Sequence, residues 1–245
     1  MRRWALALAA AVLGGCGFQS YTPPARLLPL ENARAPEVGR TDLQAEASAA
    51  TGFFDFGATA GGLRVRHGVG DEVSLEAEAA TMHVSGTTSP GVDQDAYVGR
   101  VGADFHPAPD DDAWGNVAAR VGVGAGHSGL AGDWISYDLG TTISSRGRTH
   151  DVFFGAEAFG STPIRPRPFR YRAPDDAPAG GDTLTSHLDV LSQTFGGRFT
   201  LGVDVHAADE ALACTFGAFV GVIGDGNSKT DAFGGLGAAV RWKLP

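Results

Sequence analysis

The chain has 245 residues, a formal net charge of -9 at pH 7 and 36 glycines. This charge excludes a nucleic-acid backbone as a partner, because that contact depends on clustered Lys and Arg. Beyond the N-terminal leader, no apolar run approaches the roughly 18 residues of a membrane helix. Any membrane span must therefore be built from strands.

The first residues have the pattern of an export signal. Arg2 and Arg3 precede an apolar stretch at 5–15 that is too short to cross a bilayer, which predicts a signal peptide over 1–15. The tetrapeptide Leu13-Gly14-Gly15-Cys16 resembles the bacterial lipobox. The resemblance implies cleavage before Cys16, its acylation with fatty acids such as palmitate, and tethering of the mature lipoprotein to a membrane leaflet. Cys214 is then the one remaining thiol, so no internal disulfide is expected.

The next stretch contains prolines without a period, at Pro23, Pro24, Pro29 and Pro36. Such a composition is typical of an extended connection. We therefore expect 16–40 to be a linker between a lipidated Cys16 and the folded body, and 41–245 to form one β-barrel domain.

From residue 41 onward, apolar and polar residues alternate with the period of two that is typical of strands. Counting such runs predicts ten strands, near 42–50, 60–67, 72–84, 95–106, 114–125, 132–144, 149–160, 196–206, 211–223 and 231–244. An even number places both ends of the barrel on one side. The lipid anchor, the linker and the C-terminus would then all be periplasmic.

The first predicted hairpin has a charged face and an apolar face. If 69–71 form a three-residue loop, Gly68 pairs with Glu72 and Arg64 lies opposite Glu76. Both faces would then continue across the two strands.

The alternation alone fits two architectures, a soluble barrel with apolar side chains inside and a membrane barrel with apolar side chains facing lipid. The polar face is rich in arginine together with carboxylates, which suits a lumen where guanidinium groups meet acids. Its acids are Asp42, Glu46, Glu76, Glu78, Asp104, Asp138, Asp151, Glu157 and Asp204, and its bases are Arg64, Arg66, Arg100, Arg120, Arg198, Arg241 and Lys243. We predict an all-β fold, a single antiparallel up-and-down transmembrane β-barrel of about ten strands, with a lumen closed by ion pairs.

These features resemble the small outer-membrane β-barrel proteins of Gram-negative bacteria, including those with an N-terminal lipobox. The likeness covers 41–244 by pattern and 13–16 by motif. The last strand is similar to the C-terminal insertion signal of that family, with alternate apolar residues that end at Trp242 and Leu244, although the chain finishes on Pro245.

Catalytic and metal-binding chemistry is not expected. The seven histidines are scattered singly, without the spacing of metal ligands. His127-Ser128 invites comparison with outer-membrane lipid A deacylases, but adjacent strand residues point to opposite faces. We predict no cofactor, no metal and no enzymatic activity.

The longest predicted connection carries the most biased chemistry. Four arginines, Arg165, Arg167, Arg170 and Arg172, lie there with two aromatic residues. On an extracellular loop they would contact anionic glycolipid, such as lipopolysaccharide phosphates; a solvated loop is the simpler alternative.

The sequence thus favours a lipid-anchored protein of the outer membrane with a structural or surface-interaction role. Two alternatives stay open, a soluble lipid-anchored barrel that binds a small ligand and a lipid-modifying barrel enzyme.

Overall fold

The computed structural model describes residues 22–24, 26–52, 56–86, 94–107, 115–129, 132–145, 147–174, 184–189, 193–206, 211–225 and 230–244. The predicted signal peptide at 1–15 and the predicted lipidation residue Cys16 lie outside the described residues. Within them, no helix is long and apolar enough to cross a membrane.

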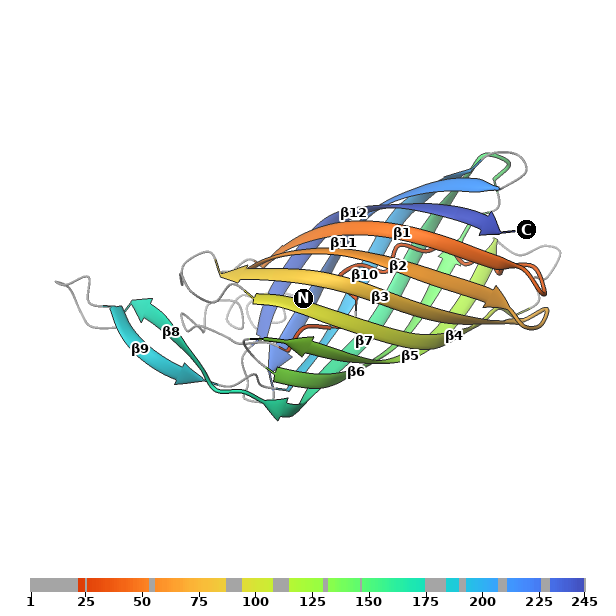
Figure 1. The fold of residues 1–245 in the computed structure, drawn as a ribbon. Coiled ribbons are helices and arrows are strands. Elements are labelled where there is room, and N and C mark those ends of the chain that lie inside the picture. The colour runs from red at the N-terminus through yellow and green to blue at the C-terminus, as the bar shows by residue number, and fades with distance from the viewer. Residues whose placement is uncertain are drawn as a thin grey trace, which may run out of the picture.

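Ten antiparallel strands close into one barrel, which confirms the predicted fold class and strand number. Each strand pairs with its chain neighbour, except that β7 pairs with β10, and β1 closes the barrel against β12 (Figure 1). The barrel strands are β1 (Thr41–Gly52), β2 (Phe56–Gly68), β3 (Val73–Gly86), β4 (Gln94–Phe105), β5 (Asn116–Ser128), β6 (Gly132–Ser144), β7 (His150–Pro166), β10 (Thr194–His206), β11 (Leu212–Asp225) and β12 (Thr230–Leu244).

The connection between β7 and β10 contains two short strands. Strands β8 (Phe169–Pro174) and β9 (Leu184–Asp189) form a separate two-stranded sheet. This hairpin projects beyond one end of the barrel, and β12 ends at the other (Figure 1). We call these two ends the hairpin rim and the C-terminal rim.

The barrel turns its apolar face outward. On β6, Ile135, Tyr137 and Leu139 are exposed, whereas Ser136 and Asp138 between them are buried. Leu139 is 63% exposed and Ser136 only 3%. The same alternation on the other strands gives an apolar exterior and a charged interior, because successive side chains of a strand point to opposite faces.

The register of the first hairpin differs from the prediction by two residues. Gly68 pairs with Ser74 rather than Glu72, and Arg64 lies opposite Glu78 rather than Glu76. The turn is longer than expected because the amides of Val69 and Gly70 both donate to the Val73 carbonyl. A shift by an even number leaves each residue on its predicted face.

The N-terminal linker is the largest departure from expectation. Instead of extending outside the barrel, its described residues 22–24 and 26–38, here called the threaded segment, run through the lumen (Figure 1). Leu28, Leu30 and Glu31 on it are almost completely buried. Three closely spaced leucines at 27–30 are better buried than exposed, and the many wall glycines leave room for them.

Candidate functional site

The candidate site is the charged lumen, where the threaded segment meets the wall. Arg26 lies at its centre and donates to three carboxylates, with distances of 2.8 Å to Glu31, 2.9 Å to Glu76 and 2.5 Å to Glu78. All four side chains are buried. A buried guanidinium with five N–H donors is stable only when carboxylates surround it in this way.

Glu31 is the second centre contributed by the threaded segment. Its carboxylate accepts from Arg26, from Arg64 through a short contact, and from Arg120 at 2.7 Å. Two arginines of the wall and one of the segment therefore contact Glu31. This acid also replaces Glu76 as the main partner of Arg64, since the Arg64 to Glu76 distance is 3.9 Å.

A planar pair connects β4 with β6. Arg100 donates two bonds to Asp138, at 2.7 and 2.6 Å, and a third, short bond to Glu76. The two-pronged geometry matches the guanidinium fork to the carboxylate and is the strongest form of this contact. Together with Arg26, it joins three strands and the segment into one network.

Two further contacts hold the segment near the C-terminal rim. Asn32 donates to Asp204 at 2.5 Å, and Asp204 also accepts from Arg241 at 2.8 Å. Arg34 donates to Asp151 at 2.5 and 3.1 Å. Segment and wall therefore share each of these carboxylates.

Wall side chains also satisfy the backbone of the segment, which has no secondary structure of its own. Arg198 donates to the carbonyls of Arg26 and Leu27, at 2.7 and 2.8 Å. Gln44 and Arg64 donate to the Leu30 carbonyl, at 2.8 and 3.0 Å. Buried backbone groups need such partners, so the wall is built to receive a chain.

The apolar part of the segment packs against aromatic wall residues. Leu27, Leu28 and Leu30 belong to a buried cluster whose other large members are Met82, Trp134, Phe153, Phe159, Phe219, Ile223 and Phe233. Wall glycines permit the approach, since a Cβ on Gly237 would lie 2.7 Å from Leu28 Cδ2.

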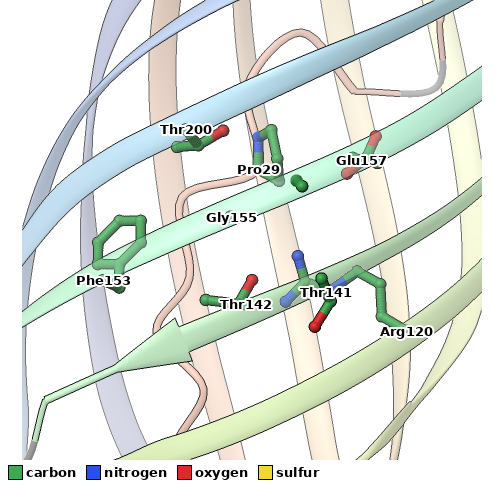
Figure 2. Close-up of a pocket in the computed structure, with 9 residues that line it drawn as sticks. Pro29, Arg120, Thr141, Thr142, Phe153, Gly155, Glu157 and Thr200 are labelled. Atoms are coloured by element: carbon green, nitrogen blue, oxygen red, sulfur yellow. The ribbon is translucent and has the colours of Figure 1, made fainter.

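One void in the lumen lies beside the threaded segment. It lies between Pro29 of the segment and wall residues that include Arg120, Thr142, Glu157 and Thr200 (Figure 2). It has room for about one water molecule. This void is therefore too small for a cargo molecule.

Three carboxylates of the network come close enough together to suggest a metal site. Oxygens of Glu31, Glu76 and Asp104 lie within 4.8 Å of one another. Each acid is already held by arginine, as shown by Arg120, which lies 2.7 Å from Glu31 and 3.4 Å from Asp104. The donor set is thus occupied by guanidinium groups, and we assign no metal here.

All ten residues predicted to form ion pairs in the lumen are buried there. They are Arg64, Arg66, Glu76, Glu78, Arg100, Asp104, Arg120, Arg198, Asp204 and Arg241. The structure joins them differently from the hairpin prediction, because several pair through the segment. Sequence reasoning missed Arg26, Glu31, Asn32 and Arg34; the available signal was the apolar Leu27-Leu28-Pro29-Leu30 flanked by charge.

The predicted arginine loop lies at the hairpin rim. Arg165 is near the end of β7, Arg167 follows it, and both are exposed; Arg170 and Arg172 lie on β8. Arg167 donates to the Gly129 carbonyl at 3.5 Å.

The His127-Ser128 pair is divided between the two faces. The His127 ring is half exposed and lies 2.6 Å from Asp133, whereas Ser128 is buried and donates to Gln94 at 2.9 Å. The hydroxyl and the imidazole therefore do not form a nucleophile and base pair.

No protein-family model matches this chain, and no curated protein matches it significantly. Solved structures do resemble it. Neisserial surface protein A (NspA) is 13% identical, with 83% of this chain and 97% of that one covered and a TM-score of 0.39. The outer membrane protease OmpT of Escherichia coli is 7% identical, with 90% and 100% covered and a TM-score of 0.46. The outer membrane protein OprG of Pseudomonas aeruginosa is 11% identical, with 86% and 98% covered and a TM-score of 0.34.

Proposed function

We propose that this chain is an outer-membrane β-barrel lipoprotein with a structural or surface-interaction role, closed by ion pairs and by its own N-terminal segment. The observation that carries this proposal is the direction of the side chains. Large apolar residues such as Leu236, Leu139 and Val220 are 68%, 63% and 61% exposed, around a buried set of arginines and acids.

Such an exterior fits lipid and not water. A soluble monomer rarely exposes a continuous apolar patch larger than a few hundred Å², whereas this barrel exposes large apolar residues on nine of its ten strands. The same argument disfavours the soluble ligand-binding alternative, in which the apolar face of the strands would surround a cavity. The small void beside Pro29 supports a closed lumen.

The proposal also includes a lipid anchor and a contact with the membrane surface. Cys16 would carry the acyl chains, and Arg165, Arg167, Arg170 and Arg172 would meet anionic glycolipid at the hairpin rim. The exposure of Arg165 and Arg167 at the end of a strand supports this contact, because guanidinium groups bind phosphate through two bonds.

Gel mobility of detergent-extracted membranes tests the barrel. We expect the unheated protein to migrate differently from the boiled protein, as a folded barrel that resists detergent does, and to carry labelled palmitate that is lost in Cys16→Ser. A protein that leaves the membrane as Cys16→Ser and migrates alike with and without boiling would support the soluble alternative and contradict the proposal.

The glycolipid contact has its own test. We expect replacement of the four arginines by glutamine to weaken binding of the refolded barrel to lipopolysaccharide micelles. Arg148→Gln, an exposed arginine at the C-terminal rim, is the matched control and should bind as the wild type does. Equal binding by all three proteins would assign the four arginines to a solvated loop.

A further inference from the structure

The two ends of the threaded segment lie at opposite rims of the barrel. Val38 forms a bridge with Gly68, the last residue of β2, and Glu37 lies 3.9 Å from Lys243 near the end of β12. These contacts place residues 37–38 at the C-terminal rim.

The other end of the segment reaches the hairpin rim. The Thr22 amide donates to Thr194 at 2.9 Å, and the Pro23 carbonyl accepts from Ser161 at 2.8 Å. Thr194 is the first residue of β10, and its partners across the sheet are Ser161 and the last residue of β11, Asp225. The chain therefore passes through the full length of the lumen.

We propose that the barrel carries its own N-terminus to the far side of the membrane, so that Cys16 and its acyl chains lie at the hairpin rim, in the outer leaflet. This inference rests on the proposed outer-membrane barrel and lipidation. It replaces the expectation that the anchor shares the periplasmic side with the C-terminus.

The reach of the chain supports this placement. Thr22 lies six positions after Cys16, with five residues between them, and six steps of extended chain span at most about 22 Å. The 13 residues of β10 extend about 40 Å, or about 30 Å along the axis of a tilted barrel. Cys16 is thus too close to Thr22 to return to the C-terminal rim.

The direction of the segment is fixed by specific contacts along its length. Arg34 pairs with Asp151 near the C-terminal rim, Arg26 pairs with Glu76 and Glu78 deeper inside, and Thr22 bonds Thr194 at the hairpin rim. A reversed segment would place its two arginines and Glu31 against different partners. Buried charges without partners are strongly unfavourable. The ion pairs therefore favour the observed direction of the segment over the reversed one.

Thiol labelling on intact cells tests the inference. In a Cys214→Ser background, Ser20→Cys supplies a thiol beside the proposed exit. We expect a membrane-impermeant maleimide to label it on intact cells as well as it labels Gly180→Cys in the β8–β9 connection. Asp71→Cys in the turn at the C-terminal rim should be labelled only after permeabilisation.

The outcomes separate the two proposals. Labelling of Ser20→Cys only after permeabilisation, with Gly180→Cys accessible throughout, would overturn the threading and leave the barrel in place. Inaccessible Gly180→Cys would overturn the membrane orientation, and with it the placement of Cys16 in the outer leaflet. The Cys214→Ser parent should stay unlabelled, because acylation converts the Cys16 sulfur into a thioether; labelling of this parent on intact cells would support the exit at the outer face and contradict the lipidation.

A disulfide measures the threading directly. Thr22→Cys paired with Thr194→Cys, in the same Cys214→Ser background, should cross-link under mild oxidation in isolated membranes. Thr22→Cys paired with His206→Cys, at the other end of β10, should stay reduced. Cross-linking of the second pair and not the first would overturn the proposal.

Discussion

Arg26 holds three buried carboxylates of the lumen together. It contacts Glu31, Glu76 and Glu78 at once, and its side chain is 1% exposed. Removal of one partner from a buried ionic network leaves the other charges without compensation, which costs more than the loss of an exposed pair. Arg26 is therefore expected to contribute far more to stability than arginines at the rims.

Arg26→Met tests this expectation. We predict a loss of about 3–5 kcal/mol in the free energy of unfolding, measured by urea unfolding in lipid vesicles with tryptophan fluorescence. Arg40→Met is the matched control, because Arg40 is exposed and lies 4.0 Å from Glu37, and a change below about 1 kcal/mol is expected there. Equal effects of the two substitutions would refute the buried network.

Gly237 is a second sensitive position, for steric reasons. A Cβ there would lie 2.7 Å from Leu28 Cδ2 and 3.0 Å from the Ala47 carbonyl, whereas a Cβ on Gly99 would meet no atom within 4 Å. We predict that Gly237→Ala lowers stability by about 1–3 kcal/mol through overpacking, and that Gly99→Ala leaves it nearly unchanged. The same unfolding assay measures both changes. An unchanged free energy of unfolding for Gly237→Ala would show that Leu28 does not pack against Gly237.

His106 gives the lumen a pH dependence. It follows β4 at the C-terminal rim, donates from Nδ1 to the Ala33 carbonyl at 3.1 Å, and lies 3.2 Å from the Ser74 hydroxyl. Burial, and next the guanidinium of Arg66, lower its pKa below the ordinary value of 6.5, with Arg120 acting in the same direction and Asp104 opposing it. The folded state therefore holds a neutral imidazole.

The unfolded chain binds a proton at His106 more readily than the folded barrel does, so acidification favours unfolding. The contribution of His106 to the free energy of unfolding should be constant above about pH 7 and fall as the pH drops below about 6.5. His106→Gln keeps a donor for Ala33 but cannot titrate. We predict that the free energy of unfolding of the wild type, minus that of His106→Gln, falls as the pH drops from 7 to 5. A constant difference over this range would contradict the role of His106.

At the scale of elements, the threaded segment completes the barrel. The wall residues assigned to the lumen include nine acids and seven bases, so the wall alone has an excess of carboxylates. The segment adds Arg26 and Arg34 with only one acid, Glu31, inside. It therefore fills the space and offsets the charge at the same time.

Deletion of 22–35 should open the lumen. We predict that the deleted barrel still shifts its migration on boiling but conducts ions across a planar bilayer, with lower thermal stability. The wild type and a barrel without 175–183, a connection at the hairpin rim, should not conduct. Absence of conductance in the correctly folded deletion would mean that the wall side chains close the lumen alone.

The strands could be predicted from sequence because a period of two is a local signal. Leu139, Val121 and Val203 alternate with polar neighbours, and one side of each strand must face lipid or a core. The partners of the lumen charges could not be predicted in the same way. Hairpin spacing predicts Glu76 as the partner of Arg64, but the turn length and the inserted Glu31 decide the contacts of Arg64.

The segment was missed for a related reason. Its four prolines prevent regular structure, and irregular structure usually lies at the surface. Only the closed barrel creates an interior in which Leu27, Leu28 and Leu30 can be buried without forming an element. That interior forms only when all ten strands close, so no local sequence pattern predicts it.

At the scale of the whole molecule, one arrangement accounts for the sequence: apolar residues outside, charges inside and an irregular chain along the axis. The central claim is that the exterior faces acyl chains. Leu139 on β6 is 63% exposed, and Ser136 on the same strand faces the lumen and is 3% exposed. Probes at these two positions therefore report the two sides of a single strand.

Quenching by lipid tests this claim most directly. Leu139→Cys and Ser136→Cys, each with Cys214→Ser, with Cys16 replaced by serine and with 22–35 deleted so that the lumen has room for the label, would carry a small fluorophore in vesicles whose acyl chains bear a spin label. We predict strong quenching of the probe at 139 and weak quenching at 136. Strong quenching at 136 with weak quenching at 139 would mean that the strands are turned the other way.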